Sequence, residues 1–367
     1  MRQGIPDRQG ARAPRGWSRV GAALVLLGAW GAWAAGGSSA LMAEASAGGT
    51  QRTWTVLGEL ELRRDRTFLN VGYTGVRTTE DDALSHQLSA GVDHALTEHW
   101  LLSGLLTGGL PKASTTVLAP ARPALGLPAL DTRNSYSSVG VQLAASYDSA
   151  GFSDAEYGLD LGLGLTGYGL RREMLARDKD SAAHTLSQAK DQLLLARPSL
   201  GGRLLLHDVW ELGLRGDYYV YSEDPLSVGH FTPDEFEQVL RRYADSSEAS
   251  SAVLSSIRRR LKAMAADLTG RLQGLNALTG FPSAPVSFDL KPSVSYRFGS
   301  RVRGQLSYAF SEYVSGQGYV HVLGTRWTWR PLKPLRVWAA LALQSDHPQD
   351  EPVQRSVLVT LGSEYTF

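Results

Sequence analysis

The chain has no cysteine, no excess of charge of either sign, and no long apolar run outside its N-terminal region. Without cysteine the protein can form no disulfide and can carry no lipid on an N-terminal cysteine. The 37 Lys and Arg residues nearly balance the 36 Asp and Glu residues. Nucleic-acid binding is typical of a basic excess, so we expect no nucleic-acid partner. Because a membrane helix needs about 20 apolar residues, the sequence also excludes a helical inner-membrane protein.

The N-terminus has the three parts of a secretory signal peptide. A basic leader precedes an apolar run from Val20 to Ala35, and small residues continue to Gly49. We predict a signal peptide over residues 1–47. Sites of the Ala-x-Ala type end at Ala34 and Ala47, and we favour cleavage after Ala47. An exported chain whose other apolar segments are only strand-length is either periplasmic or an outer membrane barrel.

The rest of the chain alternates apolar and polar residues, as a β-strand with two different faces does. In residues 286–298 the apolar face holds Val286, Phe288, Leu290, Val294, Tyr296 and Phe298. Many such segments reach ten residues, near the ~9–11 that cross a membrane at a tilt. The 39 Gly, 14 Tyr and 9 Trp residues are also typical of membrane strands. We predict an all-β fold, an antiparallel transmembrane β-barrel, with a soluble β domain as the alternative.

The C-terminal strand carries the one specific motif. Val357, Val359, Leu361, Tyr365 and Phe367 alternate with small or polar residues up to the last position. The pattern formed by Gly362, Tyr365 and Phe367 resembles the β-signal of Gram-negative outer membrane β-barrel proteins, with porin-like and transporter-like character and no specific family. The resemblance implies localisation in the cell outer membrane, assembly by the barrel assembly machinery, and contact with outer membrane lipid and lipopolysaccharide.

Counting back from the C-terminus gives about twelve strands, from 67–77 to 355–367. Another strand-like piece, Trp54–Leu62, makes thirteen, although bacterial barrels prefer even numbers. Three interpretations stay open: this piece is periplasmic or luminal, it merges with its neighbour, or a further strand brings the total to fourteen. We therefore divide the chain into an N-terminal segment, 48–66, which includes this extra strand in one interpretation, and a barrel, 67–367. The tight connections are 97–99, 207–208, 299–301 and 330–334, and the long ones on the opposite side are 111–134, 171–190, 223–285 and 346–354.

Charged residues on the polar faces are the candidate functional residues, because these faces point into the lumen. Acidic residues dominate the early strands and basic residues the late ones, so an acidic wall would face a basic one. One interpretation is that the acidic and basic walls produce an electric field across a water-filled passage, as in general porins. The other is that the charges pair across the lumen and close it. The predicted lumen charges are Asp93, Glu156, Asp160, Arg215, Asp217, Lys291, Arg297, Arg303, Arg326 and Arg336.

One insertion, 223–285, breaks the β pattern. Between Leu254 and Leu275, apolar residues recur at spacings of three and four. This pattern predicts an amphipathic helix in an extracellular loop. Three interpretations stay open: a small extracellular helical hairpin, a constriction in the barrel mouth, or a surface within 232–280 that binds lipopolysaccharide or a protein partner. The residues of this partner or plug helix are Ile257, Leu261, Met264 and Leu268.

Nothing in the sequence has the spacing of a catalytic or metal-binding site, and we expect no enzyme, cofactor or metal. The predicted function is a passive channel or transporter for small solutes. The alternative is a surface interaction or scaffold protein that displays the helical loop to a partner in an envelope assembly.

Overall fold

The protein is built from one antiparallel β-sheet. The computed structural model describes residues 38–48, 51–78, 85–119, 129–149, 155–177, 184–225, 285–349 and 352–366. In these segments fifteen strands belong to a single sheet. Among the same residues, no helix is long and apolar enough to cross a membrane.

The strands follow one another along the chain with few interruptions. The first eight are β1 (Ser38–Gly48), β2 (Gln51–Arg64), β3 (Thr67–Thr78), β4 (Ser85–Ala95), β5 (Trp100–Ala119), β6 (Ala129–Asp148), β7 (Ala155–Arg177) and β8 (His184–Leu206). The remainder are β9 (Trp210–Tyr218), β10 (Val220–Tyr221), β11 (Val286–Phe298), β12 (Val302–Tyr313), β13 (Gly318–Leu332), β14 (Leu335–Pro348) and β15 (Gln354–Thr366), with a 3-10 turn, η2 (Val314–Gly316), before β13.

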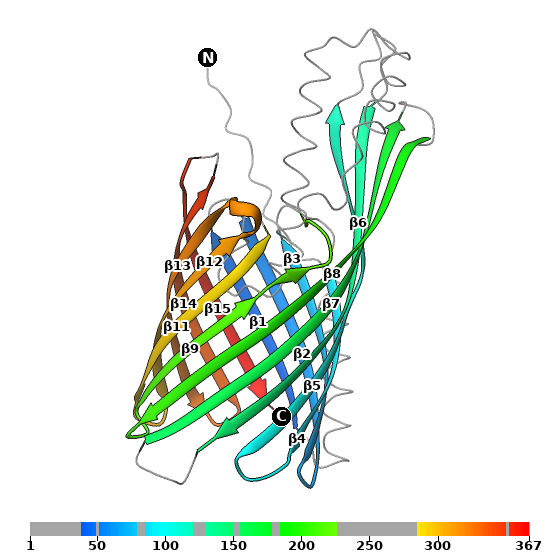
Figure 1. Ribbon diagram of the computed structural model, residues 1–367. Helices are drawn as coiled ribbons and strands as arrows, with labels where there is room; N and C mark the ends of the chain where they lie inside the picture. The colour runs from blue at the N-terminus through cyan, green and yellow to red at the C-terminus, as the bar shows by residue number, and fades with distance from the viewer. Residues whose placement is uncertain are drawn as a thin grey trace, which may run out of the picture.

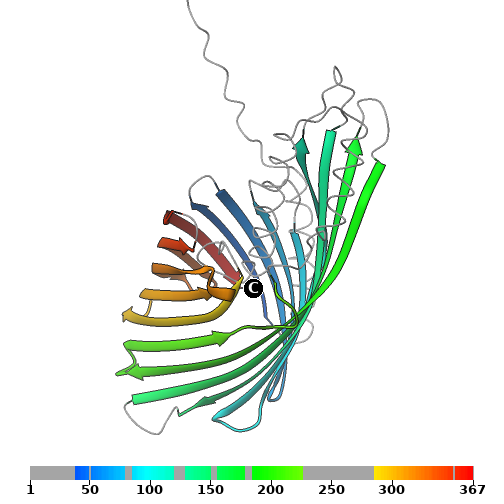
Figure 2. The ribbon, with the colours of Figure 1, turned by 45° about the horizontal axis from the view of Figure 1, so that its top comes forward.

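The sheet closes on itself. Consecutive strands pair along the chain, β1 pairs with β15, and β9 pairs with both β8 and β11. The strands accordingly follow one another around a barrel wall (Figures 1 and 2). Because β10 is a two-residue continuation of β9 that pairs only with β8, the described residues form a ring of fourteen strands. The predicted total of twelve is wrong, because Trp54–Leu62 lies within β2 of the ring and β1 is a further strand beside it.

The predicted boundary between the signal peptide, 1–47, and the N-terminal segment, 48–66, falls inside a strand of the barrel wall. Strand β1 lies almost wholly within the predicted signal peptide, and its Ala47 pairs with Val359 of β15 and Arg52 of β2. The segment 48–66 is likewise no separate part, because β2 belongs to the ring. Cleavage after Ala47 would remove nearly all of β1, whereas cleavage after Ala34 would leave it whole. The cleavage itself stays a prediction, since residues 1–37 lie outside the described part of the chain.

The outer face of the ring is apolar. Residues paired across antiparallel strands point to the same side, so the register places Leu143 with Leu163, and Leu361 with Ala45 and Ala339, on the outer face. Their side chains are open to the surroundings: Leu143 is 58% exposed and Leu361 is 60% exposed. A soluble protein rarely exposes so much contiguous apolar surface. The outer face is therefore a lipid-facing band.

Aromatic side chains border this band at both ends. At the end that holds the short turns, Tyr296 lies 4.6 Å from Trp210 and 4.5 Å from Phe298, measured between ring centroids. At the other end, Tyr319 stacks on His347 at 4.7 Å, and the Tyr308 hydroxyl lies 2.6 Å from Nδ1 of His321. Such paired girdles mark the two membrane–water interfaces of a transmembrane barrel.

The connections differ in length between the two ends, as predicted. The turns at the end of the barrel where β15 terminates are tight. They are 65–66, 207–209, 299–301 and 333–334. His207 and Asp208 both have positive φ, the conformation that a tight hairpin turn requires. On the opposite side, 111–134 and 171–190 are not loops, because most of each continues as strand in β5 to β8. These strands rise beyond the rest of the ring (Figure 1).

The predicted helical insertion cannot be compared with the structure. Residues 226–284 lie outside the described part of the chain, and with them Ile257, Leu261, Met264 and Leu268. The interpretations of the insertion therefore stay predictions.

We expect the mature protein to begin upstream of Ser38, with cleavage after Ala34. Removing β1 would leave the edges of β2 and β15 without partners in lipid, where unsatisfied backbone groups cost several kcal/mol each. Intact-mass measurement of the exported protein gives the terminus directly. A variant truncated to begin at Gly49 should fail to migrate as a folded barrel, whereas one beginning at Ala35 should fold. A mature mass that begins at Gly48 would contradict this expectation.

Candidate functional site: the lumen wall

The inner face of the ring is polar and contains many small residues. On β4 and β5, Asp93 pairs with Ser103 and Ser89 with Thr107, while Asp160 of β7 pairs with Gly201 of β8. The strand pairings place all ten predicted lumen charges on the inner face of the ring. They are Asp93 on β4, Glu156 and Asp160 on β7, Arg215 and Asp217 on β9, Lys291 and Arg297 on β11, Arg303 on β12, Arg326 on β13 and Arg336 on β14.

Ion pairs in this wall run between strands that are close together in the ring. Arg336 of β14 pairs with Glu364 of β15 at 3.2 Å. Arg303 of β12 reaches Glu211 of β9 at 3.0 Å and also donates to Ser295 of β11, which lies between them, at 2.9 Å. These side chains therefore extend along the wall.

Glycines on β7 make room for arginines from β8 to lie flat. Arg203 crosses β7 at Gly158 and pairs with Asp148 of β6. A Cβ at Gly158 would lie 2.5 Å from Nε of Arg203, so a side chain there would displace the guanidinium. Arg197 lies opposite Gly164 of β7, where a Cβ would be 3.6 Å from its Nε, an ordinary contact distance.

Four charged residues form a compact group on β9 and β11, which we call the charge quartet: Arg215, Asp217, Asp289 and Lys291. The two carboxylates are direct cross-strand partners, and so are the two cations. Lys291 Nζ contacts Asp289 at 2.7 Å and Asp217 at 3.6 Å, while Arg215 pairs with Asp217 at 3.0 Å. Both aspartates are buried, at 3% and 5% exposure. Tyr219 completes the group by donating to Asp289 at 2.8 Å.

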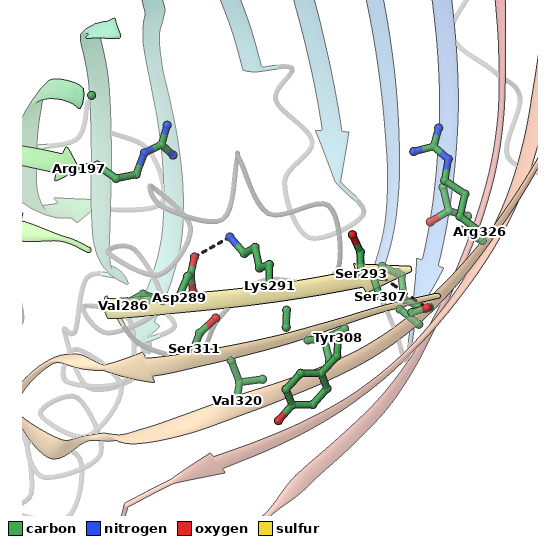
Figure 3. A pocket seen from close by; sticks show the side chains of 18 of the residues that line it. Arg197, Val286, Asp289, Lys291, Ser293, Ser307, Tyr308, Ser311, Val320 and Arg326 are labelled. Atoms are coloured by element: carbon green, nitrogen blue, oxygen red, sulfur yellow. Dashed lines mark hydrogen bonds and ion pairs between the residues drawn. The ribbon is translucent and has the colours of Figure 1, made fainter. Parts of the chain in front are cut away.

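A cavity of about 680 Å³ lies inside the ring at the level of the charge quartet. Figure 3 shows Lys291 and Asp289 joined at its edge, with Arg197 and Arg326 on opposite sides. Its charged lining consists of Arg197, Lys291 and Arg326 against the single carboxylate of Asp289. The neutral polar lining comprises Thr74, Gln87, Ser89, Thr107, Gln142, Thr166, Ser293, Gln305, Ser307, Ser311, Gln344 and Thr360. A lining of hydroxyl and amide groups can replace part of the hydration shell of a polar solute.

The predicted assembly signal contacts the wall through its glycine. A Cβ at Gly362 would lie 2.3 Å from the ring of Trp338, the partner of Gly362 on β14. Trp338 faces inward and is almost fully buried, and the guanidinium of Arg326 lies 4.8 Å from its ring centroid. Tyr365 faces outward beside Leu335, while Phe367 lies outside the described residues.

The structure brings together only some of the predicted charges. Arg215, Asp217 and Lys291 meet in the charge quartet, whereas Asp93 and Arg336 lie at separate places on the wall. Asp289 was not among the predicted site residues, although alternation places it on the same face as Lys291. The partners Asp148, Glu211 and Glu364 could not be identified, since pairing between strands depends on register, which one strand's alternation does not give.

Comparison with known proteins finds distant structural similarities only. No family model matches the chain, and no curated protein matches it. A Pseudomonas aeruginosa FadL homologue is 10% identical, with 90% of this chain and 88% of that chain covered and a TM-score of 0.45. The translocator domain of the autotransporter NalP from Neisseria meningitidis is 10% identical over 95% and 98% of the two chains, with a TM-score of 0.43. The KdgM porin is 11% identical over 89% and 99%, with a TM-score of 0.35.

The chain has the fold of an outer membrane β-barrel. The closed ring, the lipid-facing band and the two aromatic girdles are the features that identify this fold. Closed barrels of this kind span the outer membrane. The predicted localisation in the cell outer membrane agrees with it. The similarities above carry no argument about what the barrel binds or conducts.

We expect Gly362→Ala to lower the amount of folded barrel in the outer membrane. The added methyl group overlaps the ring of Trp338, and overpacking of this kind costs about 1–3 kcal/mol. Folded and unfolded protein are separated by gel migration with and without heating. Ser363→Ala, one position along on the outer face, is the matched control. The double variant Gly362→Ala/Trp338→Ala should recover folding, and a double variant as defective as the single one would refute the packing explanation.

We expect Lys291→Met to lower the urea midpoint of unfolding. Without the ammonium group, Asp217 and Asp289 face each other with less compensating charge, which costs about 1–3 kcal/mol for a partly exposed cation. Ser293→Ala, the next inward position on β11, is the control. The double variant Lys291→Met/Asp289→Asn should regain most of the loss. Equal midpoints for Lys291→Met and Ser293→Ala would contradict the role given to the quartet.

Proposed function

We propose that the barrel is a passive channel for small polar solutes. The observation that carries this proposal is the cavity inside the closed ring, whose lining combines hydroxyl, amide and guanidinium groups with apolar side chains such as Leu195, Val320 and Leu358. An inner face that only filled the barrel would leave no such space between its side chains. A cavity with polar groups on several strands favours a hydrated passage.

The direction of the ion pairs supports the same conclusion. Pairs that crossed the lumen would block it, whereas Arg203 with Asp148 and Arg336 with Glu364 join strands that are near neighbours in the ring. The glycines at 158 and 164 let long side chains lie against the wall. The wall therefore neutralises much of its charge without occupying the axis.

The size of the ring fits a restricted passage. Eight-stranded barrels are filled by side chains, and those of sixteen to eighteen strands hold an open aqueous channel. Fourteen strands lie between these limits, so a lumen narrowed by its own side chains is expected. Such a lumen passes small solutes and excludes large ones.

The scaffold alternative depends on the insertion, whose residues lie outside the described part of the chain. It predicts that polar substitutions at Ile257, Leu261 and Leu268 abolish function while lumen substitutions are tolerated. No contact in the described residues favours it over the channel.

The test is single-channel conductance of the full-length refolded barrel in a planar bilayer, with and without residues 230–280. Steady conductance of the intact protein supports the channel. Conductance only after the deletion also supports a passage and identifies the insertion as a plug. If neither form conducts although both migrate as folded barrels, the proposal is refuted. The variant Arg355→Gln, which removes a cation from the outer face, should leave the conductance unchanged and serves as a control.

A further inference from the structure

Arg197 differs in its partner from five other cations of the lumen wall. Arg203, Arg215, Lys291, Arg303 and Arg336 each form an ion pair with a carboxylate. In the described part of the chain Arg197 forms none, and its Nη2 donates instead to the neutral amide oxygen of Gln142 at 3.4 Å. Among the described residues no carboxylate oxygen therefore lies within ion-pair distance of its guanidinium.

The backbone around Arg197 orients this charge toward the cavity. Gly164 lies beside it on β7, and a Cβ there would be 3.6 Å from its Nε, so the side chain rests against the wall over the glycine. Gln142 on β6 then holds one edge of the guanidinium. Since a guanidinium presents five donors in one plane, a single bond to Gln142 leaves donors that can face the cavity.

Lys291 and Arg326 line the same cavity. Lys291 is paired with the carboxylates of Asp289 and Asp217, and Arg326 lies over the face of Trp338. The positive potential proposed for the cavity therefore comes from Arg197, and the low-dielectric walls strengthen its effect on anions.

The remaining lining indicates what kind of anion fits. Strands β3 to β5 contribute Thr74, Gln87, Ser89 and Thr107 to the lining of the same cavity, and these residues offer hydroxyl and amide groups. A guanidinium matches the planar geometry of a carboxylate and can bind it through two parallel hydrogen bonds. The hydroxyl and amide wall matches the hydroxyl groups of the same solute.

We propose that Arg197 is the solute-contacting residue of a lumen subsite for small hydroxylated carboxylates. This rests on the proposed channel function and deepens it, because it states which solutes the passage selects. Arg197 binds the carboxylate, and the hydroxyl and amide side chains that β3 to β5 contribute to the cavity exchange hydrogen bonds with the hydroxyl groups of the solute.

The experiment measures reversal potentials of the full-length barrel in a salt gradient of potassium chloride and then of potassium gluconate, which is a hydroxylated carboxylate. We expect anion selectivity in both salts and a reduction of the chloride current by added gluconate. Sorbitol, an uncharged polyol of similar size, should reduce the current less. In Arg197→Gln, which keeps an amide able to contact Gln142, the anion-to-cation permeability ratio should fall about threefold, the effect of one charge at short range in water.

Controls separate this proposal from the channel itself. Arg355→Gln makes the same charge change on the outer face and should keep the wild-type selectivity, while Arg197→Lys should keep the anion preference and weaken the block by gluconate. If the barrel conducts without preferring anions, or if Arg197→Gln behaves as wild type, the subsite is refuted and the channel stands. If the folded barrel does not conduct at all, both proposals fail. Should Arg197→Gln not fold, the wild-type reversal potential and the comparison of gluconate with sorbitol decide alone.

Discussion

Lipid offers no hydrogen-bond partner to a peptide group, and this constraint requires every strand of the sheet to have two neighbours. The chain meets it at two seams. At one, the N-terminal strand β1 pairs with the C-terminal strand β15 from Ala40 opposite Thr366 to Gly48 opposite Leu358. At the other, β9 pairs with β11, which follows the long insertion rather than a short turn. The two seams complete the ring.

The seam between β9 and β11 has more side-chain interactions than two strands joined by a short turn would need for their alignment. The charge quartet spans β9 and β11, and Tyr219 and Tyr221 donate to Asp289 and to the backbone oxygen of Val286. These bonds hold together two strands whose connecting segment is long and so contributes little to their alignment. The same residues form one side of the cavity, so the group that aligns the seam also shapes the passage.

On the inner face, small residues lie next to long side chains, so the long side chains can lie against the wall and leave space at the centre of the lumen. Gly158 and Gly164 accommodate Arg203 and Arg197, and Gly362 accommodates Trp338. In each case a glycine on one strand provides the space that a long side chain of the next strand occupies. The wall can therefore carry many charges and still leave a cavity at its centre, which an inner face of uniformly large residues would fill.

Much of the architecture follows from local pattern. Alternation, strand length and the aromatic ends determined the barrel class, most strand positions from 67–78 onward, and the face on which Asp93, Lys291 and Arg326 lie, because the period of two in a strand is local. Strand β1 was missed because its small residues also suit the end of a signal peptide. The ends of β5 and β7 were placed too early and the starts of β6 and β8 too late, since no Gly–Asn or similar signal separates a long strand from its loop.

The sequence by itself determined that this chain is a membrane barrel with a polar inner face, since a strand's two faces are decided by its own residues. The tertiary structure alone decided that β1 joins the ring of described strands, that Asp148, Glu211, Asp289 and Glu364 are partners of wall cations, and that Arg197 has a neutral partner instead. These facts depend on the register between strands, which arises only when the whole ring closes and every backbone group finds its neighbour.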